Sequence, residues 1–343
     1  MKKIYALMLC ALCVVSVRAQ DIHFSQYYAA PLSVNPAFTG MVNGVFRATF
    51  NYRNQWFNIP TLNTIAPYQT YQASFDMPLL RDRLGNDGFG IGGMFYNDKA
   101  GDGALTTFSG MVSIAYHKSV DRYGKGHLSL GMQAGVVSKQ VNINNLVFEN
   151  QLDNFGFNTN LSNGETNYSG KALIYPDVNI GAMWSHAAKD NFHYYFGFAM
   201  DHLSRPKESF LNDGGSNRLP YRYNVNGGAE IFLNRDQSLS LDPTFLFMLQ
   251  SNAQQYNFGV AINYWINDDV AVFGGPWYRI NDAVILAVGA EFYNVRLGLS
   301  YDVNNSDLKT ATHAQGALEL SLQYVFKKEK PGKTQYANYC PIF

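Results

Sequence analysis

Three glycines of the chain stand at the spacing that other proteins use to bind dinucleotides. The stretch GFGIGG at residues 88–93 places Gly88, Gly90 and Gly93 in the order G-x-G-x-x-G. A dinucleotide site requires a helix that begins at these glycines, because the helix N-terminus faces the pyrophosphate. The residues that follow, MFYND, instead continue a strand pattern. We therefore predict no cofactor and place the glycines mainly on the inner face of a wall, where space is limiting.

The sequence contains no recognisable set of residues for metal binding or for hydrolysis. The histidines lack the HxxxH and HxH spacings of a close ligand set, which leaves only a metal site built across neighbouring strands. These histidines are His117, His186, His193 and His202. The chain contains no G-x-S-x-G sequence, so it has no nucleophile elbow. We predict a protein that is not an enzyme, with no catalytic residues and no metal ligands.

Residues 1–19 are predicted to form a secretory signal peptide. Two lysines precede an apolar run over residues 4–17, and residues 17–19 supply a small-x-small cleavage site. The run is shorter than the ~20 residues of a transmembrane helix, so we expect the mature chain to begin near Gln20. Only Cys340 then remains of the 3 cysteines, which excludes an intramolecular disulfide.

The composition argues against nucleic-acid binding and favours β structure. Lysine plus arginine total 26, as do aspartate plus glutamate, so the chain has no basic footprint for nucleic acid or an anionic membrane surface. Aromatic residues make up 15% of the chain, and glycines number 30. No apolar run after the signal approaches the length of a spanning helix. We therefore expect an exported protein that is built from strands.

Alternating apolar and polar residues predict strands along most of the chain. In FRATFNYRNQW, Phe46, Ala48 and Phe50 face one side, while arginine, threonine and asparagine face the other. Fourteen such segments follow one another: 44–56, 67–77, 88–97, 104–117, 127–139, 175–186, 192–203, 221–233, 238–249, 255–267, 269–279, 283–293, 294–303 and 314–326.

The two faces of these segments distinguish a membrane barrel from a soluble β-sandwich. The polar face is mostly Gly, Ser, Thr, Asn and Gln, with fewer charges than the exposed face of a soluble sheet carries. The apolar face is flanked by aromatic residues such as Trp56, Trp184 and Tyr264, as at a lipid interface. An even number of strands also suits a closed barrel, which pairs every backbone group inside the membrane. We predict an all-β fold, a transmembrane antiparallel β-barrel of about fourteen strands over residues 44–326, surrounded by outer-membrane lipid.

Connection lengths predict how the barrel is oriented. The connections after odd-numbered strands include the long stretches 140–174 and 204–220, while most of the others are short turns. Long loops lie at the cell surface in outer-membrane barrels, so we expect both termini in the periplasm. Residues 79–87 and 118–126 are long for periplasmic turns, which makes the strand register hardest to predict in the first third.

Two segments flank the predicted barrel. Residues 20–43 contain Pro31 and Pro36, which break any strand ladder. We predict that this segment is a periplasmic lead-in that packs against the barrel floor, contacts a periplasmic partner or plugs the lumen. Residues 327–343 are predicted to form a periplasmic tail, whose lysines suit an acidic partner.

The order of several sequence blocks carries a resemblance to a known family. HFSQYYAAPLSVNPAFTG followed by FRATFNYRNQW resembles the start of the PorP/SprF family of Bacteroidetes outer-membrane proteins, which is associated with type IX secretion and gliding motility. Further blocks keep the family's order over essentially the whole mature chain: NDKAG, AYH, FGFAMDHLSRP, FLFMLQSNAQQYNFGV, LGLSYDVNNSDL and GALELSLQYVF. The ending NYCPIF is also similar to that of the family, which makes Cys340 a packed or partner-facing residue.

The resemblance implies two roles without enzymatic activity. One is to anchor or receive secreted surface proteins such as adhesins. The other is to dock periplasmic components of the type IX secretion or motility machinery, including peptidoglycan-binding ones. The sequence leaves both roles open, and it does not identify the secreted protein.

Aromatic residues outside the predicted strands are the candidate partner-binding residues. Loop 140–174 carries several that water alone does not favour, and loops of this size on a barrel are usually functional or folded into the lumen. The segments before and after the barrel carry the others. The candidates are Phe148, Phe155, Phe157, Tyr27, Tyr28, Phe38, Tyr339 and Phe343.

A general diffusion channel is the alternative function. A porin typically has opposing charges at its constriction, whereas the predicted lumen face lacks clustered arginine and aspartate. A plug formed by loop 140–174 or by residues 20–40 would also close the lumen. We therefore favour the anchoring or docking roles.

Overall fold

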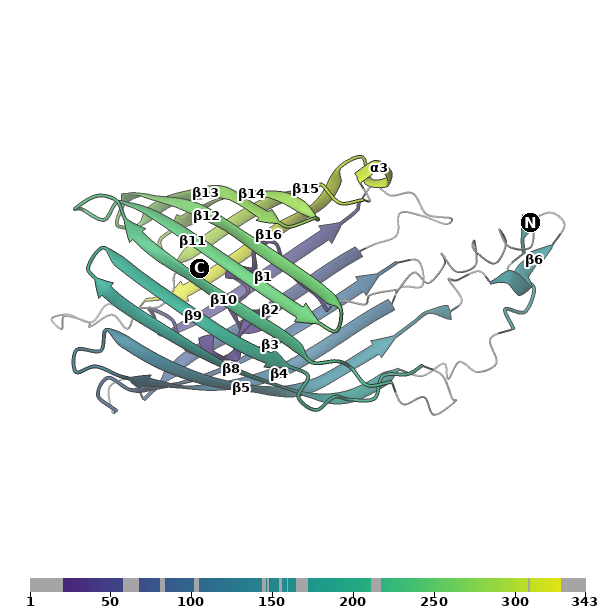
Figure 1. The fold of residues 1–343 in the computed structure, drawn as a ribbon, viewed down its shortest axis with the longest axis horizontal. Helices are drawn as coiled ribbons and strands as arrows, with labels where there is room; N and C mark the ends of the chain where they lie inside the picture. Colours follow the sequence, from purple (N-terminus) through teal and green to yellow (C-terminus); the bar gives the residue numbers. More distant parts are fainter. Residues whose placement is uncertain are drawn as a thin grey trace, which may run out of the picture.

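A closed antiparallel β-barrel forms the body of the protein (Figure 1). The computed structural model describes residues 21–57, 68–80, 84–101, 105–143, 146, 148–153, 156–158, 160–164, 172–210, 217–307 and 309–327. The barrel strands are β1 (Phe46–Gln55), β2 (Tyr68–Leu79), β3 (Gly88–Ala100), β4 (Leu105–Ser119), β5 (Gly126–Gln140), β8 (Leu173–Lys189), β9 (Phe192–Asp201), β10 (Arg222–Phe232), β11 (Leu239–Gln250), β12 (Ala253–Asn267), β13 (Val270–Arg279), β14 (Ala283–Phe292), β15 (Val295–Asn304) and β16 (Gln315–Phe326). Each pairs with the next along the chain, and β1 closes the barrel against β16.

The predicted barrel of fourteen strands is confirmed over the described chain, with strand ends that differ by a few residues. The closing pair runs without interruption from Phe46 opposite Phe326 to Gln55 opposite Ala317. In the first third, β2 and β4 each pair with β3 without a register shift. Irregular register occurs instead in later pairs, for example at residues 187–189 of β8.

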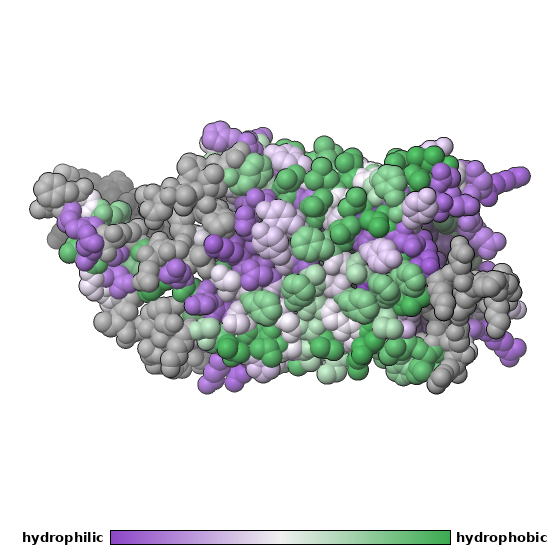
Figure 2. All heavy atoms as spheres, turned by 180° about the vertical axis from the view of Figure 1, so that it is seen from behind, coloured by the Kyte–Doolittle hydropathy of each residue, from purple (hydrophilic) through white to green (hydrophobic). Residues whose placement is uncertain are grey.

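The wall has one apolar and one polar face because successive side chains of a strand point to opposite sides. In β4, Phe108, Val112 and Ile114 are exposed by 48%, 62% and 57%, whereas Ser109 and Ser113 are buried. Figure 2 shows apolar residues over much of the middle of this face of the barrel, with hydrophilic residues toward both ends. This apolar band is the surface that meets lipid. None of the helices in the described residues has the length and hydropathy of a membrane span.

The two ends of the barrel differ in their connections. At one end, which we call the short-turn end, tight turns such as those from β8 to β9 and from β14 to β15 join the strands. The opposite, long-loop end carries the connections from β5 to β8, from β9 to β10, and from β15 to β16, which includes α3 (Lys309–Thr312). The first of these contains η4 (Glu149–Gln151), β6 (Leu152–Asp153) and β7 (Gly156–Phe157), and it projects well beyond the barrel rim (Figure 1).

The chain before β1 runs through the interior of the barrel. We call residues 21–45 the luminal segment; it contains η1 (Tyr27–Ala29), α2 (Pro31–Val34) and η2 (Pro36–Phe38). A proline begins each of the last two, at the position where its missing N–H has no helical partner to lose. Almost every residue over 24–42 is buried. The lumen is therefore filled by the chain's own beginning.

The luminal segment starts at the long-loop end and finishes at the short-turn end. Asp21 N–H donates to Gln250 Oε1 at 3.2 Å, and Gln250 is the residue with which β11 ends at the long-loop rim. Val45 N–H donates to Phe326 O at 2.7 Å, at the short-turn rim. Residues 21 and 327, the first and last that the structure describes, therefore lie at opposite ends of the barrel. Strand patterns give no information on a non-periodic segment that crosses the lumen before β1.

Candidate functional site

The luminal segment packs aromatic residues against the inner wall. Tyr28 stacks on Trp277 with ring centroids 5.0 Å apart, and Phe38 meets Tyr195 edge-on at 5.7 Å. All four belong to one cluster of buried apolar residues, together with Tyr27. Because the strands alone present a largely polar inner face, this apolar core exists only where the segment meets the wall.

The first anchor joins main-chain amides of the luminal segment to a carboxylate of β16. Ser25 N–H donates to Glu319 Oε1 at 2.7 Å, and Gln26 N–H donates to Glu319 Oε2 at 2.8 Å. Ser25 Oγ also donates to Asp302 Oδ2 of β15 at 2.7 Å. Hydrogen bonds to a charged acceptor are roughly twice as strong as neutral ones. The segment is thus held by the last two strands of the wall.

Two arginines neutralise these buried carboxylates. Arg53 is paired with Glu319, and Arg279 Nη2 lies 2.8 Å from Asp302 Oδ2. Both guanidinium groups also donate to Ser25 Oγ, at 2.8 and 2.9 Å. A buried charge without such partners would be strongly destabilising. The expectation that the lumen lacks clustered arginine and aspartate is therefore wrong, because the charges come from strands far apart in the sequence.

The second anchor is a single asparagine whose side chain uses both its amide and its carbonyl group. Asn35 Oδ1 accepts from Ala37 N–H at 2.9 Å and so caps η2. Its Nδ2 donates to the carbonyls of Ala182 and Phe198 at 3.2 and 3.3 Å, and to Asn226 Oδ1 at 3.3 Å. Asn35 is completely buried, so these bonds replace those that water would make.

The third anchor lies toward the short-turn end. Arg47 makes two hydrogen bonds of 2.9 Å to the carboxylate of Asp76, which also accepts Gly40 N–H at 2.7 Å. Thr39 O lies 2.9 Å from His117 Nε2, and since a carbonyl only accepts, Nε2 carries the proton. Gly40 adopts a φ of 72°, which favours glycine, and this turn directs the chain toward β1.

Glycines of the wall make room for the luminal segment. A Cβ atom on Gly90 would lie 1.9 Å from Thr39 O, and one on Gly131 would lie 2.3 Å from the carbonyl carbon of Pro36. Contacts this short exclude any side chain unless the segment moves. A Cβ on Gly88 meets nothing within 4 Å. Gly90, the second glycine of GFGIGG, therefore serves close packing against the chain's own backbone.

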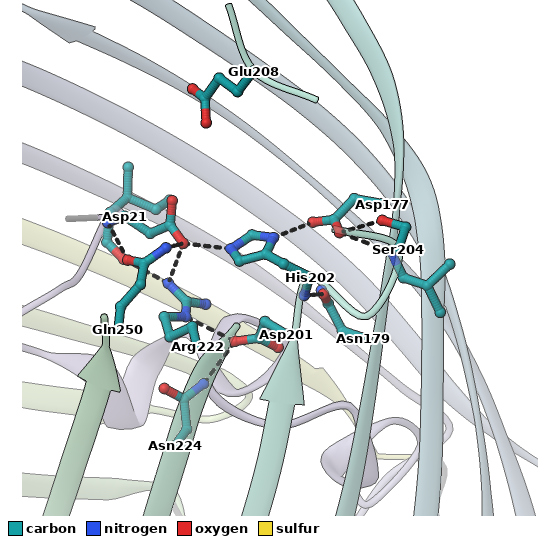
Figure 3. A network of polar contacts seen from close by, with 12 residues as sticks. Asp21, Asp177, Asn179, Asp201, His202, Ser204, Glu208, Arg222, Asn224 and Gln250 are labelled. Atoms are coloured by element: carbon teal, nitrogen blue, oxygen red, sulfur yellow. Dashed lines mark hydrogen bonds and ion pairs between the residues drawn. The ribbon is translucent and has the colours of Figure 1, made fainter. Parts of the chain in front are cut away.

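A polar network, which we call the latch, holds the start of the luminal segment at the long-loop end (Figure 3). His202 lies between two carboxylates, with Nε2 2.5 Å from Asp21 Oδ2 and Nδ1 2.7 Å from Asp177 Oδ2. Gln250 Nε2 donates to the same Asp21 oxygen at 2.9 Å, and Arg222 Nη1 lies 3.7 Å from it. Through the latch, Asp21 contacts β10, β11 and the residue that directly follows β9.

The geometry of the latch requires a charged histidine. Both ring nitrogens of His202 face carboxylate oxygens, so both donate. Burial alone would lower the pKa of His202, but Asp21 and Asp177 outweigh it and raise the pKa to about 9. His202 also has a φ of 63°, held by its N–H bond to Asn179 Oδ1 at 3.1 Å. Within the described part of the chain, no three His, Cys, Asp or Glu side chains gather as metal ligands would.

A family model for type IX secretion system membrane proteins, PorP/SprF, matches residues 16–324. The chain belongs to the PorP/SprF family. The family and the closed, apolar-faced wall together place it in the outer membrane. No protein with a curated description matches the sequence.

Solved barrels of other bacteria are similar to this PorP/SprF chain in fold. The Ralstonia pickettii toluene transporter TbuX is 12% identical, over 87% of this chain and 94% of its own, with a TM-score of 0.48. A Pseudomonas aeruginosa FadL homologue is also 12% identical, over 85% and 93%, with a TM-score of 0.48. The P. putida toluene transporter TodX is 10% identical, over 86% of this chain and 93% of its own, with a TM-score of 0.44.

The PorP/SprF structure places three predicted partner-binding residues inside the barrel. Tyr27, Tyr28 and Phe38 are exposed by 3%, 7% and 1% and pack in the apolar core of the lumen. In this arrangement they offer no surface to another protein. Sequence reasoning missed the residues that fix the segment, such as Glu319 and His202, because no local pattern shows their partners.

The other predicted residues lie in the long connection and the tail. Phe148 is half-buried and Phe157 is 54% exposed. Phe155, Tyr339 and Phe343 lie outside the described residues, as do the signal peptide and Cys340.

Residues 148–164 of the long connection, which we call the distal hairpin, have an internal structure. Gln151 organises it: its Oε1 accepts from Phe148 N–H at 3.1 Å, its Nε2 donates to Leu161 O at 3.0 Å, and its carbonyl accepts from Asn158 N–H at 2.7 Å. Gln151 itself is 6% exposed. A loop with buried polar contacts of this kind holds a defined shape, so it can present a surface.

Proposed function

We propose that this PorP/SprF protein is a closed outer-membrane scaffold, neither a channel nor an enzyme, that retains a secreted surface protein. The partner binds at the long-loop end, which faces the cell exterior. Support for this orientation comes from the general rule that outer-membrane barrels keep short turns on the periplasmic side. The family match supports a role in type IX secretion.

The filled lumen is the observation that argues against a diffusion channel. The luminal segment crosses the whole barrel and donates hydrogen bonds to buried carboxylates of the wall, from Gly40 to Asp76 and from Ser25 to Asp302. Releasing it would break several charge-assisted hydrogen bonds and expose an apolar core at the same time. A segment held in this way does not open for passing solutes.

The distal hairpin is the observation that supports retention of a protein partner. Leu152 and Phe157 lie opposite each other on β6 and β7 and are 57% and 54% exposed. Leu161, nearby in the same hairpin, is 41% exposed. Here the projecting hairpin is remote from the lipid-facing band (Figure 1), so these apolar groups do not face lipid. Apolar groups on a structured projection are typical of a protein interface.

Docking of periplasmic components is the other role that the family resemblance implies. It would involve the short-turn end and residues 327–343, of which only Lys327 is described. The proposal therefore rests on the long-loop end, and the experiment below separates the two roles.

Two double variants test the proposed retention. We expect L152S/F157S to release the secreted surface protein into the medium, because it removes the apolar surface of the distal hairpin and leaves the wall intact. The matched control, Y123S/L233S, removes two exposed apolar side chains at the short-turn end, which are 73% and 56% exposed. The measurement is the fraction of the secreted protein on cells and in the medium. If L152S/F157S keeps the secreted protein on the cell and Y123S/L233S releases it, the periplasmic docking role is favoured instead.

A further inference from the structure

A cavity of about 1190 Å³ opens at the long-loop end of the barrel. Residues Asp21, Ile22 and His23 of the luminal segment line it, together with the rims of β1, β2, β3, β12 and β13. We call this cavity the vestibule. Its volume exceeds the ~300–1,000 Å³ of typical small-molecule pockets, so it suits part of a polymer.

The luminal segment presents unpaired main chain to the vestibule. Asp21, Ser25 and Gln26 donate their N–H groups to side chains of the wall. Between them, the N–H groups of Ile22 and His23 have no hydrogen-bond partner among the described residues. Main-chain donors that no other protein group uses, beside an open cavity, are available to a ligand. They are the groups with which an added peptide segment pairs.

The charges that line the vestibule favour a cationic ligand. Arg53 and Arg279 are already paired with buried carboxylates, as described above. Asp98 and Asp307 line the cavity, and neither has an ion-pair partner in the described chain; Asp98 accepts only from a threonine hydroxyl. The unbalanced charge of the vestibule is therefore negative.

Side chains of the vestibule add aromatic and amide contacts. Trp56 and Tyr68 line it with rings 5.0 Å apart in an edge-on arrangement. Aromatic faces attract lysine and arginine side chains by about 0.5–1 kcal/mol at exposed sites. Gln255, which is 8% exposed, also lines the cavity, and its Nε2 has no partner among the described residues. Such an amide donor matches a peptide carbonyl.

We propose that the vestibule binds an extended segment of a second polypeptide that carries lysine or arginine side chains. The main chain of the segment pairs with Ile22 and His23, and its cationic side chains lie near Asp98 and Asp307. The proposal deepens the proposed function by adding a second contact at the same end of the barrel. It is separate from the distal hairpin, so either contact can fail without the other.

Binding of defined peptides to the purified full-length protein in lipid nanodiscs tests the proposal. The probes are fluorescein-labelled decapeptides of alternating Lys-Thr and of alternating Glu-Thr, and the readout is fluorescence anisotropy. We expect the Lys-Thr peptide to bind and the Glu-Thr peptide to bind at least tenfold more weakly, because like charges at the vestibule repel. A Lys-Thr peptide with N-methyl groups on alternate residues should also bind more weakly, since it cannot pair its main chain. Equal binding of all three peptides would overturn the proposal.

Charge variants locate the binding site. We expect D98N/D307N, and D307N alone, to weaken Lys-Thr binding, the double variant by about tenfold. D268N/D269N is the matched control, because both of its residues are exposed in the β12–β13 turn at the short-turn end. An equal loss in the control would mean that the peptide binds any acidic surface, which would overturn the vestibule as the site. L152S/F157S should retain full peptide binding; loss there would assign the peptide to the distal hairpin and also overturn the proposal.

Discussion

Gly90 shows how much depends on a single missing side chain. The carbonyl of Thr39 in the luminal segment lies directly against it, and a Cβ atom at 1.9 Å from that oxygen fits only if the wall or the segment moves. Gly88 belongs to the same GFGIGG stretch but has open space around it. The sequence correctly placed both glycines on the inner face of a strand, where they lie in β3. It could not separate the two, because the crowding comes from a segment about fifty residues earlier in the chain.

The variant G90A should destabilise the barrel, while G88A should not. We expect G90A to cost about 1–3 kcal/mol, since the wall or the luminal segment must shift to admit the methyl group. The measurement is the temperature at which each variant loses its compact, fast-migrating form in SDS. Equal temperatures for G90A, G88A and the unmodified protein would contradict close packing at Thr39.

The latch should weaken at high pH. The pKa of His202 is raised to about 9, above the value of 6.5 for an unperturbed histidine, so the protonated form is stabilised by folding. Its contribution to stability is fully present below pH 6.5 and is lost as the pH rises through about 9. We expect the stability gap between the unmodified protein and H202Q to be roughly 2–3 kcal/mol at pH 6 and to narrow by pH 10. A gap that does not change with pH would show that the histidine is neutral in the latch.

At the scale of elements, the strands and the luminal segment differ in how far sequence predicts them. Alternation of side chains is a local property, so the fourteen wall strands follow from it closely. The luminal segment instead bonds to residues far away, as Ser25 does to Glu319. No period marks such contacts, so its burial, its direction and its anchors needed the structure. The distal hairpin was predicted as a loop, but its order depends on Gln151, which carried no signal.

Replacing the luminal segment should turn the barrel into a channel. We expect a variant in which residues 24–43 become a Gly-Ser linker of equal length to conduct ions in planar bilayers, whereas the unmodified protein does not. The reason is that the segment supplies the apolar core and the buried partners that fill the lumen. A variant that lacks the distal hairpin is the control and should not conduct. If neither variant conducts, some other part of the chain closes the barrel.

At the scale of the whole molecule, the path of the luminal segment sets the position of the two ends of the chain. Asp21 lies at the long-loop rim and Phe326 at the short-turn rim, so the first and last described residues lie at opposite ends of the barrel. The sequence-based expectation of two periplasmic ends assumed that a chain enters its first strand from outside the barrel. In the structure, residues 21–45 reach β1 from inside the barrel.

Epitope tags should report this arrangement. We expect a tag inserted between Gln20 and Asp21 to bind antibody on intact cells, because it emerges at the long-loop end. A tag added after Phe343 should bind only after the outer membrane is permeabilised. Antibody binding to both tags, or to neither, on intact cells would show that the two ends share one side.

The first anchor also links the order of synthesis to the order of assembly. Ser25 and Gln26, made near the start of the chain, bind Glu319 on the strand made last, which also closes the wall against β1. A chain that stops before β16 therefore lacks both the closing strand and the partner that secures its own beginning. Such a truncated product would carry two exposed strand edges and a loose leading segment, which proteases recognise. The first anchor and the closed wall therefore form only in a chain whose synthesis has included β16.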